Sequence, residues 1–98
     1  MLEQSLAADP TDTFLRYGLA VQCLREEAIE EGRARLLALI ADQPTEQVAA
    51  YQQLGQSYAE SGELEAAARI LRAGIDQARQ AADEHAAAEM EQLLASLS

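Results

Sequence analysis

The side chains that could carry out acid–base or metal chemistry are few. His85 is the only histidine of the chain and stands beside Asp83 and Glu84, with no serine or cysteine near it in sequence. A general base needs a nucleophile or substrate held next to it, and a metal ion needs about three protein ligands. We therefore interpret His85 as a surface or helix-capping residue. The sequence predicts no catalytic residue, no metal site and no cofactor, and the chain is not expected to be an enzyme.

Cys23 is the only cysteine, so it cannot form an intramolecular disulfide. The one cation close to it in sequence is Arg25, and a free cysteine acts more often as a small apolar residue than as a nucleophile. No cysteine and histidine stand at the spacing of zinc ligands. Stability is therefore expected to come from the packing of secondary structure alone.

The charge balance restricts the class of partner. The 98-residue chain carries 17 carboxylates against seven arginines and no lysine, for a formal net charge of -10. Nucleic acids and anionic membranes are bound by clustered positive charge, so neither is an expected partner. No apolar run reaches the roughly 18 residues of a membrane span, and the N-terminus does not resemble a signal peptide. We expect one small cytoplasmic domain.

The elements that must position these side chains are predicted to be helices. Alanine occurs 21 times and proline twice, a composition that favours helix. Helix-breaking pairs divide the chain at residues 9–10, 43–44 and 61–62, and a softer boundary follows at 83–84. Between them apolar residues recur every three or four positions, as at Val48, Tyr51, Leu54 and Tyr58. This is the period of an amphipathic helix.

The helical segments repeat along the chain. At a shift of 37 residues, Phe14, Tyr17, Gly18 and Val21 match Tyr51, Leu54, Gly55 and Tyr58. At a shift of 35 residues, Gly32, Leu36 and Leu39 match Ala67, Leu71 and Gly74. The difference predicts two additional residues between the helices of the first copy, in a turn without glycine. A period in this range, with two helices per unit, is typical of helical repeats whose neighbouring hairpins bury each other's apolar faces.

The second copy carries a specific signature. Residues 51–67 present an aromatic residue, Leu-Gly, Tyr, Gly and Ala in order, and so resemble a tetratricopeptide repeat (TPR). Residues 11–44 resemble another copy, residues 1–10 the tail of a preceding unit, and residues 83–98 the helix that ends TPR arrays. The resemblance implies a single all-α domain of residues 1–98, with antiparallel helix hairpins stacked as a short right-handed superhelix. Its parts are repeats at 11–44 and 45–82 and a capping helix at 83–98.

Side chains at helix crossings and charges at helical spacing fit this architecture. Small residues are expected where paired helices approach to about 8–10 Å, and Gly18, Gly55, Gly32 and Ala67 stand at those places. Three carboxylates precede an arginine by four residues, which stabilises a helix by roughly 0.2–0.5 kcal/mol: Asp12 with Arg16, Glu31 with Arg35, and Glu65 with Arg69. The denser group Glu26, Glu27, Glu30 and Glu31 is either a solvated helix start or a contact for a basic partner.

A candidate binding surface follows from the helix geometry. If the repeated aromatic and apolar residues of the first helix point into its hairpin, Leu15, Leu19 and Cys23 form a second stripe at intervals of four residues. The resemblance implies that the first helix of each repeat lines a concave surface, where this stripe would lie beside a strip of glutamines. The partner-binding residues predicted there are Leu15, Arg16, Leu19, Gln22, Gln52, Gln53, Gln56 and Glu60.

We therefore expect a non-catalytic protein-interaction module, a TPR-like adaptor or scaffold that binds a peptide segment or partner protein on its concave face. Leucines would bury apolar side chains, glutamines would pair with the peptide backbone, and the acidic borders favour basic partners. Two alternatives stay open: residues 2–8 fold over the stripe, or a homodimer buries Leu15 and Leu19. Capture of chaperone C-terminal carboxylates is disfavoured, because the chain has neither lysine nor asparagine.

Overall fold

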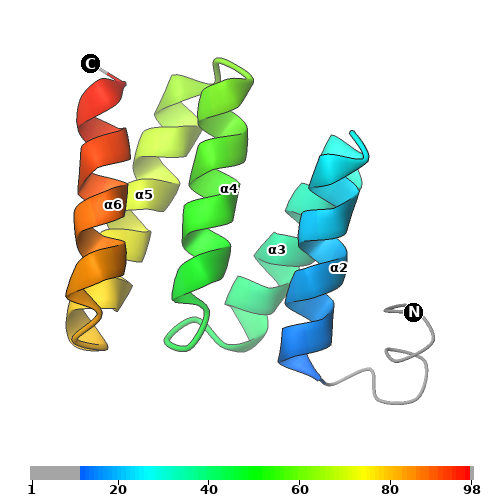
Figure 1. Cartoon of the computed structure of the whole chain (residues 1–98), viewed down its shortest axis with the longest axis horizontal. Coiled ribbons are helices and arrows are strands. Elements are labelled where there is room, and N and C mark those ends of the chain that lie inside the picture. Colours follow the sequence, from blue (N-terminus) through cyan, green and yellow to red (C-terminus); the bar gives the residue numbers. More distant parts are fainter. Residues whose placement is uncertain (1–11, 98) are drawn as a thin grey trace.

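The computed structural model describes residues 12–97, and this part of the chain contains five helices and no strand (Figure 1). The helices are α2 (Thr13–Arg25), α3 (Ile29–Asp42), α4 (Val48–Glu60), α5 (Leu64–Gln80) and α6 (Glu84–Ser96). The all-helical prediction is confirmed. The predicted tail of a preceding unit at residues 1–10 lies outside the described residues.

The helices form two layers. In Figure 1, α2, α4 and α6 lie side by side in the nearer layer, and α3 and α5 lie behind them. Helices α2 and α3 make one antiparallel hairpin and α4 and α5 a second, while α6 packs against α5 and α4. Consecutive helices are therefore spatial neighbours, as expected of a helical repeat.

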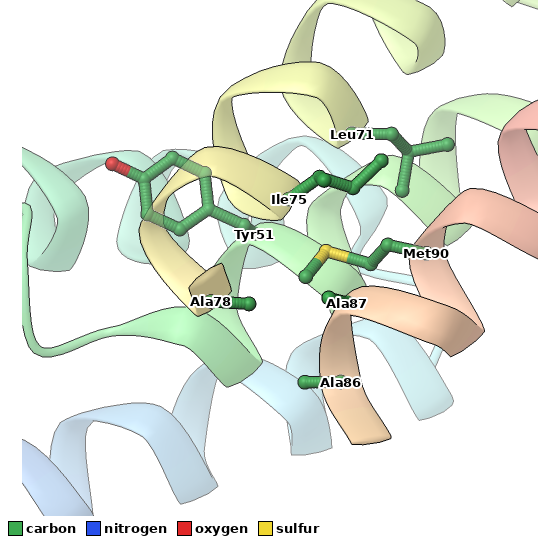
Figure 2. Packing of buried hydrophobic residues seen from close by; sticks show 7 residues of the cluster. All are labelled: Tyr51, Leu71, Ile75, Ala78, Ala86, Ala87 and Met90. Carbon is green, nitrogen blue, oxygen red and sulfur yellow. The ribbon is translucent and has the colours of Figure 1, made fainter. Parts of the chain in front are cut away.

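Two apolar clusters hold the helices together. One joins the second hairpin to α6, and its buried members are Tyr51, Leu71, Ile75, Ala78, Ala86, Ala87 and Met90 (Figure 2). The other joins the two hairpins, and its buried members are Ala20, Leu36, Ala50 and Leu54. Because the second cluster draws on α2, α3 and α4, neither hairpin buries its apolar face alone.

The connections after α2, α4 and α5 have the same conformation. Each places one residue in the left-handed region: Glu27 with φ 64°, Gly62 with φ 77° and Ala82 with φ 59°. In each turn the amide that follows this residue donates to the carbonyl five residues earlier, as Ala28 does to Cys23 at 2.8 Å. These are the bonds of a Schellman helix end, a motif that favours glycine at the left-handed position.

The two hairpins are related by a constant shift of 35 residues. Thr13 and Val48 begin α2 and α4, Ile29 and Leu64 begin α3 and α5, and the left-handed residues of the two turns also differ by 35. The predicted shift of 37 in the first helix is therefore wrong, and no residues are inserted in its turn. Glu27 occupies the place of Gly62, which is why that turn shows no glycine.

The corrected register changes which residues of α2 face inward. Leu19 and Ala20, not Tyr17 and Gly18, correspond to Leu54 and Gly55. Leu19 is 5% exposed and Ala20 is fully buried, whereas Phe14, expected inside the hairpin, is 79% exposed. A shift of two residues turns a helix by about 200°, so it exchanges the inner and outer faces. The expectation that Gly18 marks the helix crossing is wrong, because Ala20 takes that place.

The other predicted crossings are confirmed. A Cβ atom added to Gly32 would lie 2.7 Å from Leu24 Cδ2, and one added to Gly55 would lie 2.5 Å from Leu71 Cδ2. Ala67 is fully buried. Small residues therefore let the paired helices approach closely.

Of the three predicted ion pairs along a helix, one is confirmed. Arg35 Nε lies 3.1 Å from Glu31 Oε2. Arg16 instead reaches Asp42 Oδ2 at the end of α3, at 2.9 Å, while Asp12 accepts a hydrogen bond from the Leu15 amide as the N-cap of α2. The structure records no ion pair for Arg69 within residues 12–97, so the expected pair with Glu65 is wrong.

Candidate functional site

The two residues considered for catalysis have structural surroundings. The His85 side chain is 88% exposed, and its Nε2 lies 2.7 Å from Glu89 Oε1 one turn later. Among residues 12–97 no group of three histidine, cysteine or carboxylate side chains could hold a metal ion. This arrangement offers His85 a surface ion pair when it is protonated.

Cys23 is buried, and its thiol donates a hydrogen bond to Glu31 Oε2 at 3.2 Å. Burial raises the pKa of the Cys23 thiol, and the hydrogen bond to Glu31 and its negative charge raise it further. The same hydrogen bond, together with Arg35, lowers the pKa of Glu31. Because the thiolate is the reactive form of cysteine, these shifts make Cys23 a poor nucleophile.

A buried cation links the two hairpins. Arg33, 7% exposed, donates from Nε to Ser57 Oγ at 3.0 Å and from Nη2 to the Ser57 carbonyl at 3.0 Å. Its Nη2 also reaches Ser61 Oγ at 2.8 Å, and its Nη1 lies 2.8 Å from Glu63 Oε2. The guanidinium lies over the ring of Tyr58, 4.5 Å from its centre. Because all three guanidinium nitrogens have hydrogen-bond or ion-pair partners within the protein, we interpret Arg33 as a structural residue.

Hollows follow the layer formed by α2, α4 and α6. A hollow of about 290 Å³ between α2 and α4 has Val21, Arg25, Gln53, Gln56 and Glu60 in its wall. A larger one of about 610 Å³ between α4 and α6 is lined by Gln56, Ala59, Glu60, Glu89, Gln92, Leu93, Ser96 and Leu97. Gln56 and Glu60 line both hollows, so the two hollows meet on α4.

A third hollow, of about 360 Å³, lies at the start of α2 and α4. Its wall includes Phe14, Tyr17, Glu46 and Gln47. Burial raises the pKa of Tyr17, and a hydrogen bond with Gln53 acts in the opposite direction. Tyr17 therefore lines this hollow and contacts Gln53, a residue in the wall of the hollow between α2 and α4.

Comparisons with known proteins identify the fold. No protein-family model and no curated protein matches the chain. The solution structure of a tetratricopeptide repeat domain protein from Salinibacter ruber matches with a TM-score of 0.85 and 26% identity, over 92% of this chain and 90% of that one. The chain has a TPR-like fold. A crystal structure with the same description and organism gives a TM-score of 0.80 and 24% identity, over 88% of this chain and 96% of that chain.

A third solved structure shares this fold. The solution structure of a protein from Bordetella parapertussis has a TM-score of 0.85 at 24% identity, covering 98% of this chain and 83% of that one. The fold suggests a protein-interaction module. Within the described part of the chain, no helix is long and apolar enough to cross a membrane.

The TPR-like geometry sorts the predicted binding residues into two groups. Gln53, Gln56 and Glu60 line the hollows of the α2, α4 and α6 layer. Gln52 lies in the same layer, where its Nε2 contacts Glu89 Oε2 on α6 at 3.4 Å. The structure brings these four residues together in one layer.

The predicted residues of α2 lie on a different side. In the shift of 35, Leu15, Leu19 and Gln22 correspond to Ala50, Leu54 and Ser57, the side of α4 that packs against the preceding hairpin. Leu19 is 5% exposed, Leu15 is half-buried and Gln22 is exposed. Arg16 is half-buried and paired with Asp42. The suggestion that residues 2–8 cover this stripe falls on residues outside those described.

Sequence reasoning missed the residues of α2 that do line the hollows. These are Phe14, Tyr17, Val21 and Arg25, the first three of which the sequence pattern places inside the hairpin. We call the surface of the α2, α4 and α6 layer the first-helix face. It consists of these four residues of α2 together with Gln53, Gln56 and Glu60 of α4 and Glu89 and Gln92 of α6. One signal in the sequence could have located these residues. At a shift of 35, the shift that already relates the second helices, Leu19-Ala20 matches Leu54-Gly55.

Proposed function

We propose that the chain is a non-catalytic adaptor or scaffold module that binds a peptide segment of a partner protein along the first-helix face. The observation that carries the proposal is Phe14, whose side chain is 79% exposed beside Tyr17 at one end of this face. Exposed aromatic side chains next to a hollow are typical anchors of protein interfaces, because they bury a large apolar area on binding.

The rest of the face has groups that suit a peptide. Gln53, Gln56 and Gln92 offer side-chain amides that can donate to and accept from a peptide backbone. Glu60 and Glu89 line the same hollows, and Arg25 is the cation on the α2 side. With a net charge of -10 for the whole chain, the balance favours a basic partner segment.

The proposal can be tested with variants that change the face without changing the fold. A partner captured from native cells supplies the ligand, and its affinity is then measured with purified proteins. Phe14→Ala is expected to weaken binding by roughly tenfold or more with an unchanged melting temperature, because the ring is exposed. Leu37→Ala, which removes another exposed apolar side chain (43%) from α3 in the opposite layer, is the matched control.

Equal affinity of the Phe14→Ala and Leu37→Ala variants would reject the first-helix face as the binding surface. Amide chemical-shift mapping provides a second criterion. The proposal expects perturbations at Gln53, Gln56 and Gln92, and perturbations confined to α3 and α5 would contradict it.

The alternative of homodimerisation through Leu15 and Leu19 has less support. Leu19 and Cys23 are 5% and 6% exposed, so the stripe offers little apolar area to a second copy. Sedimentation velocity separates the two hypotheses, since a monomer at all concentrations is expected for a peptide-binding module. A concentration-dependent dimer that Leu15→Glu abolishes would favour the alternative.

A further inference from the structure

A separate hollow of about 470 Å³ lies between the first turns of α5 and the end of α6, outside the first-helix face. Leu64, Ala68, Leu94 and Leu97 form its apolar wall, and Arg69, Arg72 and Glu65 complete the lining. Leu64 is the first residue of α5 and is 45% exposed, while Leu97 is the C-cap residue of α6. In Figure 1 these two helix ends lie together at the upper left.

The hollow between α5 and α6 has an equivalent position between α3 and α4, where the space is filled. Arg33 and Ala68 are each the fifth residue of their helix, and Tyr58 and Leu94 are each the eleventh. Ser61 and Leu97 are the C-cap residues of α4 and α6. At the first junction the guanidinium of Arg33 fills the space against Tyr58 and Ser61. At the second, alanine replaces the arginine and leucines replace its partners, so the space stays open and apolar.

The first junction also shows how such a space is closed. The helix that follows, α5, begins there, and the carboxylate of its N-cap residue Glu63 lies 2.8 Å from Arg33 Nη1. An acidic residue at a helix start is favourable in itself, because it complements the positive end of the helix dipole. The contact thus combines a helix N-terminus, a carboxylate and an arginine.

Two arginines at the open hollow can provide the same contact. Arg69 and Arg72 are exposed, and within residues 12–97 neither makes a recorded ion pair, although the chain carries 17 carboxylates against seven arginines. The one carboxylate in the lining is Glu65. The rim therefore keeps an excess of positive charge next to apolar side chains, on a protein that is otherwise strongly acidic.

We propose that this hollow docks a helix of a partner protein that carries acidic residues in its first turn and leucine-sized side chains after it. The leucines fill the space that Arg33 fills at the other junction, and the carboxylates pair with Arg69 and Arg72. This partner chemistry is opposite to the basic peptide proposed for the first-helix face. The two surfaces therefore favour different ligands, although Leu97 borders both hollows.

The test uses a fluorescein-labelled, alanine-based helical peptide with glutamates in its first turn and leucines one and two turns later. A matched peptide has lysines in place of the glutamates. Fluorescence anisotropy with the whole chain is expected to show about tenfold tighter binding of the glutamate peptide. Amide chemical shifts are expected to change at Leu64, Ala68 and Leu94, which line this hollow alone. Equal binding of both peptides, no binding, or shift changes centred on Gln53 and Gln56 would overturn the proposal.

Variants separate the contribution of charge from that of shape. Arg69→Gln with Arg72→Gln should remove the preference for the glutamate peptide, whereas Arg35→Gln with Arg79→Gln removes the same charge from paired, exposed positions and should keep it. Ala68→Phe should fill the hollow without adding charge and weaken binding about tenfold, while Ala34→Phe on the exposed side of α3 should not. Unchanged preference in the Arg69/Arg72 variant overturns the proposal even if Ala68→Phe fails to fold. Phe14→Ala should leave this binding unaltered, which separates it from the function of the first-helix face.

Discussion

The guanidinium of Arg33 lies 4.5 Å from the ring centre of Tyr58, which places a buried cation at the boundary between the two hairpins. The same side chain donates to the hydroxyl and to the carbonyl of Ser57 and pairs with Glu63, the N-cap residue of α5. Polar contacts of this kind are directional, whereas the apolar cluster of Ala20, Leu36, Ala50 and Leu54 next to them is not. Arg33 therefore specifies how the second hairpin sits on the first.

Replacing Arg33 with leucine should destabilise the fold. The change leaves the buried Ser57 hydroxyl without its hydrogen-bond donor and removes the contact with Tyr58, at a cost of about 2–3 kcal/mol. Urea unfolding followed by circular dichroism measures the difference. Arg35→Leu is the control, because its pair with Glu31 is exposed and contributes about 0.5 kcal/mol. Similar losses in the two variants would contradict a structural role for Arg33.

The turn after α2 can be stabilised by a single substitution. Glu27 has φ 64°, a conformation that costs a residue with a Cβ atom about 1 kcal/mol relative to glycine. Glu27→Gly should therefore raise the free energy of unfolding by about 0.5 kcal/mol, after the entropy gained by the unfolded chain is subtracted. Glu26→Gly removes the same charge at φ -89° and should lower stability instead. A loss in both variants would disprove the explanation.

Two buried glycines should respond differently to alanine. A Cβ on Gly74 would lie 2.6 Å from Tyr51 Cβ, an atom fixed to its backbone, whereas a Cβ on Gly55 would meet the Leu71 side chain, 2.5 Å from Cδ2 and 2.7 Å from Cγ. Gly74→Ala should cost about 1–3 kcal/mol. Gly55→Ala should cost less, because a leucine side chain can shift further than Tyr51 Cβ and alanine gains about 1 kcal/mol in helix propensity. Thermal unfolding of both variants tests the order, and a larger loss at Gly55 would reverse it.

The free energy of unfolding should decline at alkaline pH, because folding keeps one buried thiol and two buried or half-buried phenol groups protonated. Burial raises the pKa of Cys23 above its ordinary 9.0, and those of Tyr17 and Tyr51 above 10.0. Since the unfolded chain then loses these protons first, the stabilisation is fully present below pH 9.0 and is lost as pH rises through the folded-state values. Urea unfolding near pH 8 and near pH 10 should show the fall. Cys23→Ala should make it smaller, and an equal fall in that variant would exclude the thiol as a cause.

The second hairpin was predictable because it has the usual residue type at each position where the fold restricts the choice. Gly55 and Ala67 mark the helix crossing and Gly62 marks the left-handed turn residue, so the spacing of Tyr51, Leu54 and Tyr58 led to the correct face. The identification of the fold from these residues is confirmed by the solved structures.

The first hairpin was harder because different residues meet the same requirements. Ala20 replaces glycine at the crossing, Cys23 stands where Tyr58 does, and Glu27 adopts the left-handed conformation that usually needs glycine. Tyr17-Gly18, two residues earlier, imitates Leu-Gly and led to the reversed face. The hollow beside Ala68 depends on packing between α5 and α6, which no local pattern of residues encodes.

The equal conformation of the turns at Glu27 and Gly62 bears on how a chain of this kind can grow. A segment of residues 28–62 begins and ends at equivalent points of two turns. The two ends of a duplicated copy would therefore have the same turn conformation as the segments they join. Every helix would keep the same side facing inward. An insertion of one residue inside a helix would instead rotate everything after it by about 100°. Tandem duplication in whole units of 35 residues is thus the change in length that this architecture tolerates, whether it occurs in a genome or in a designed array.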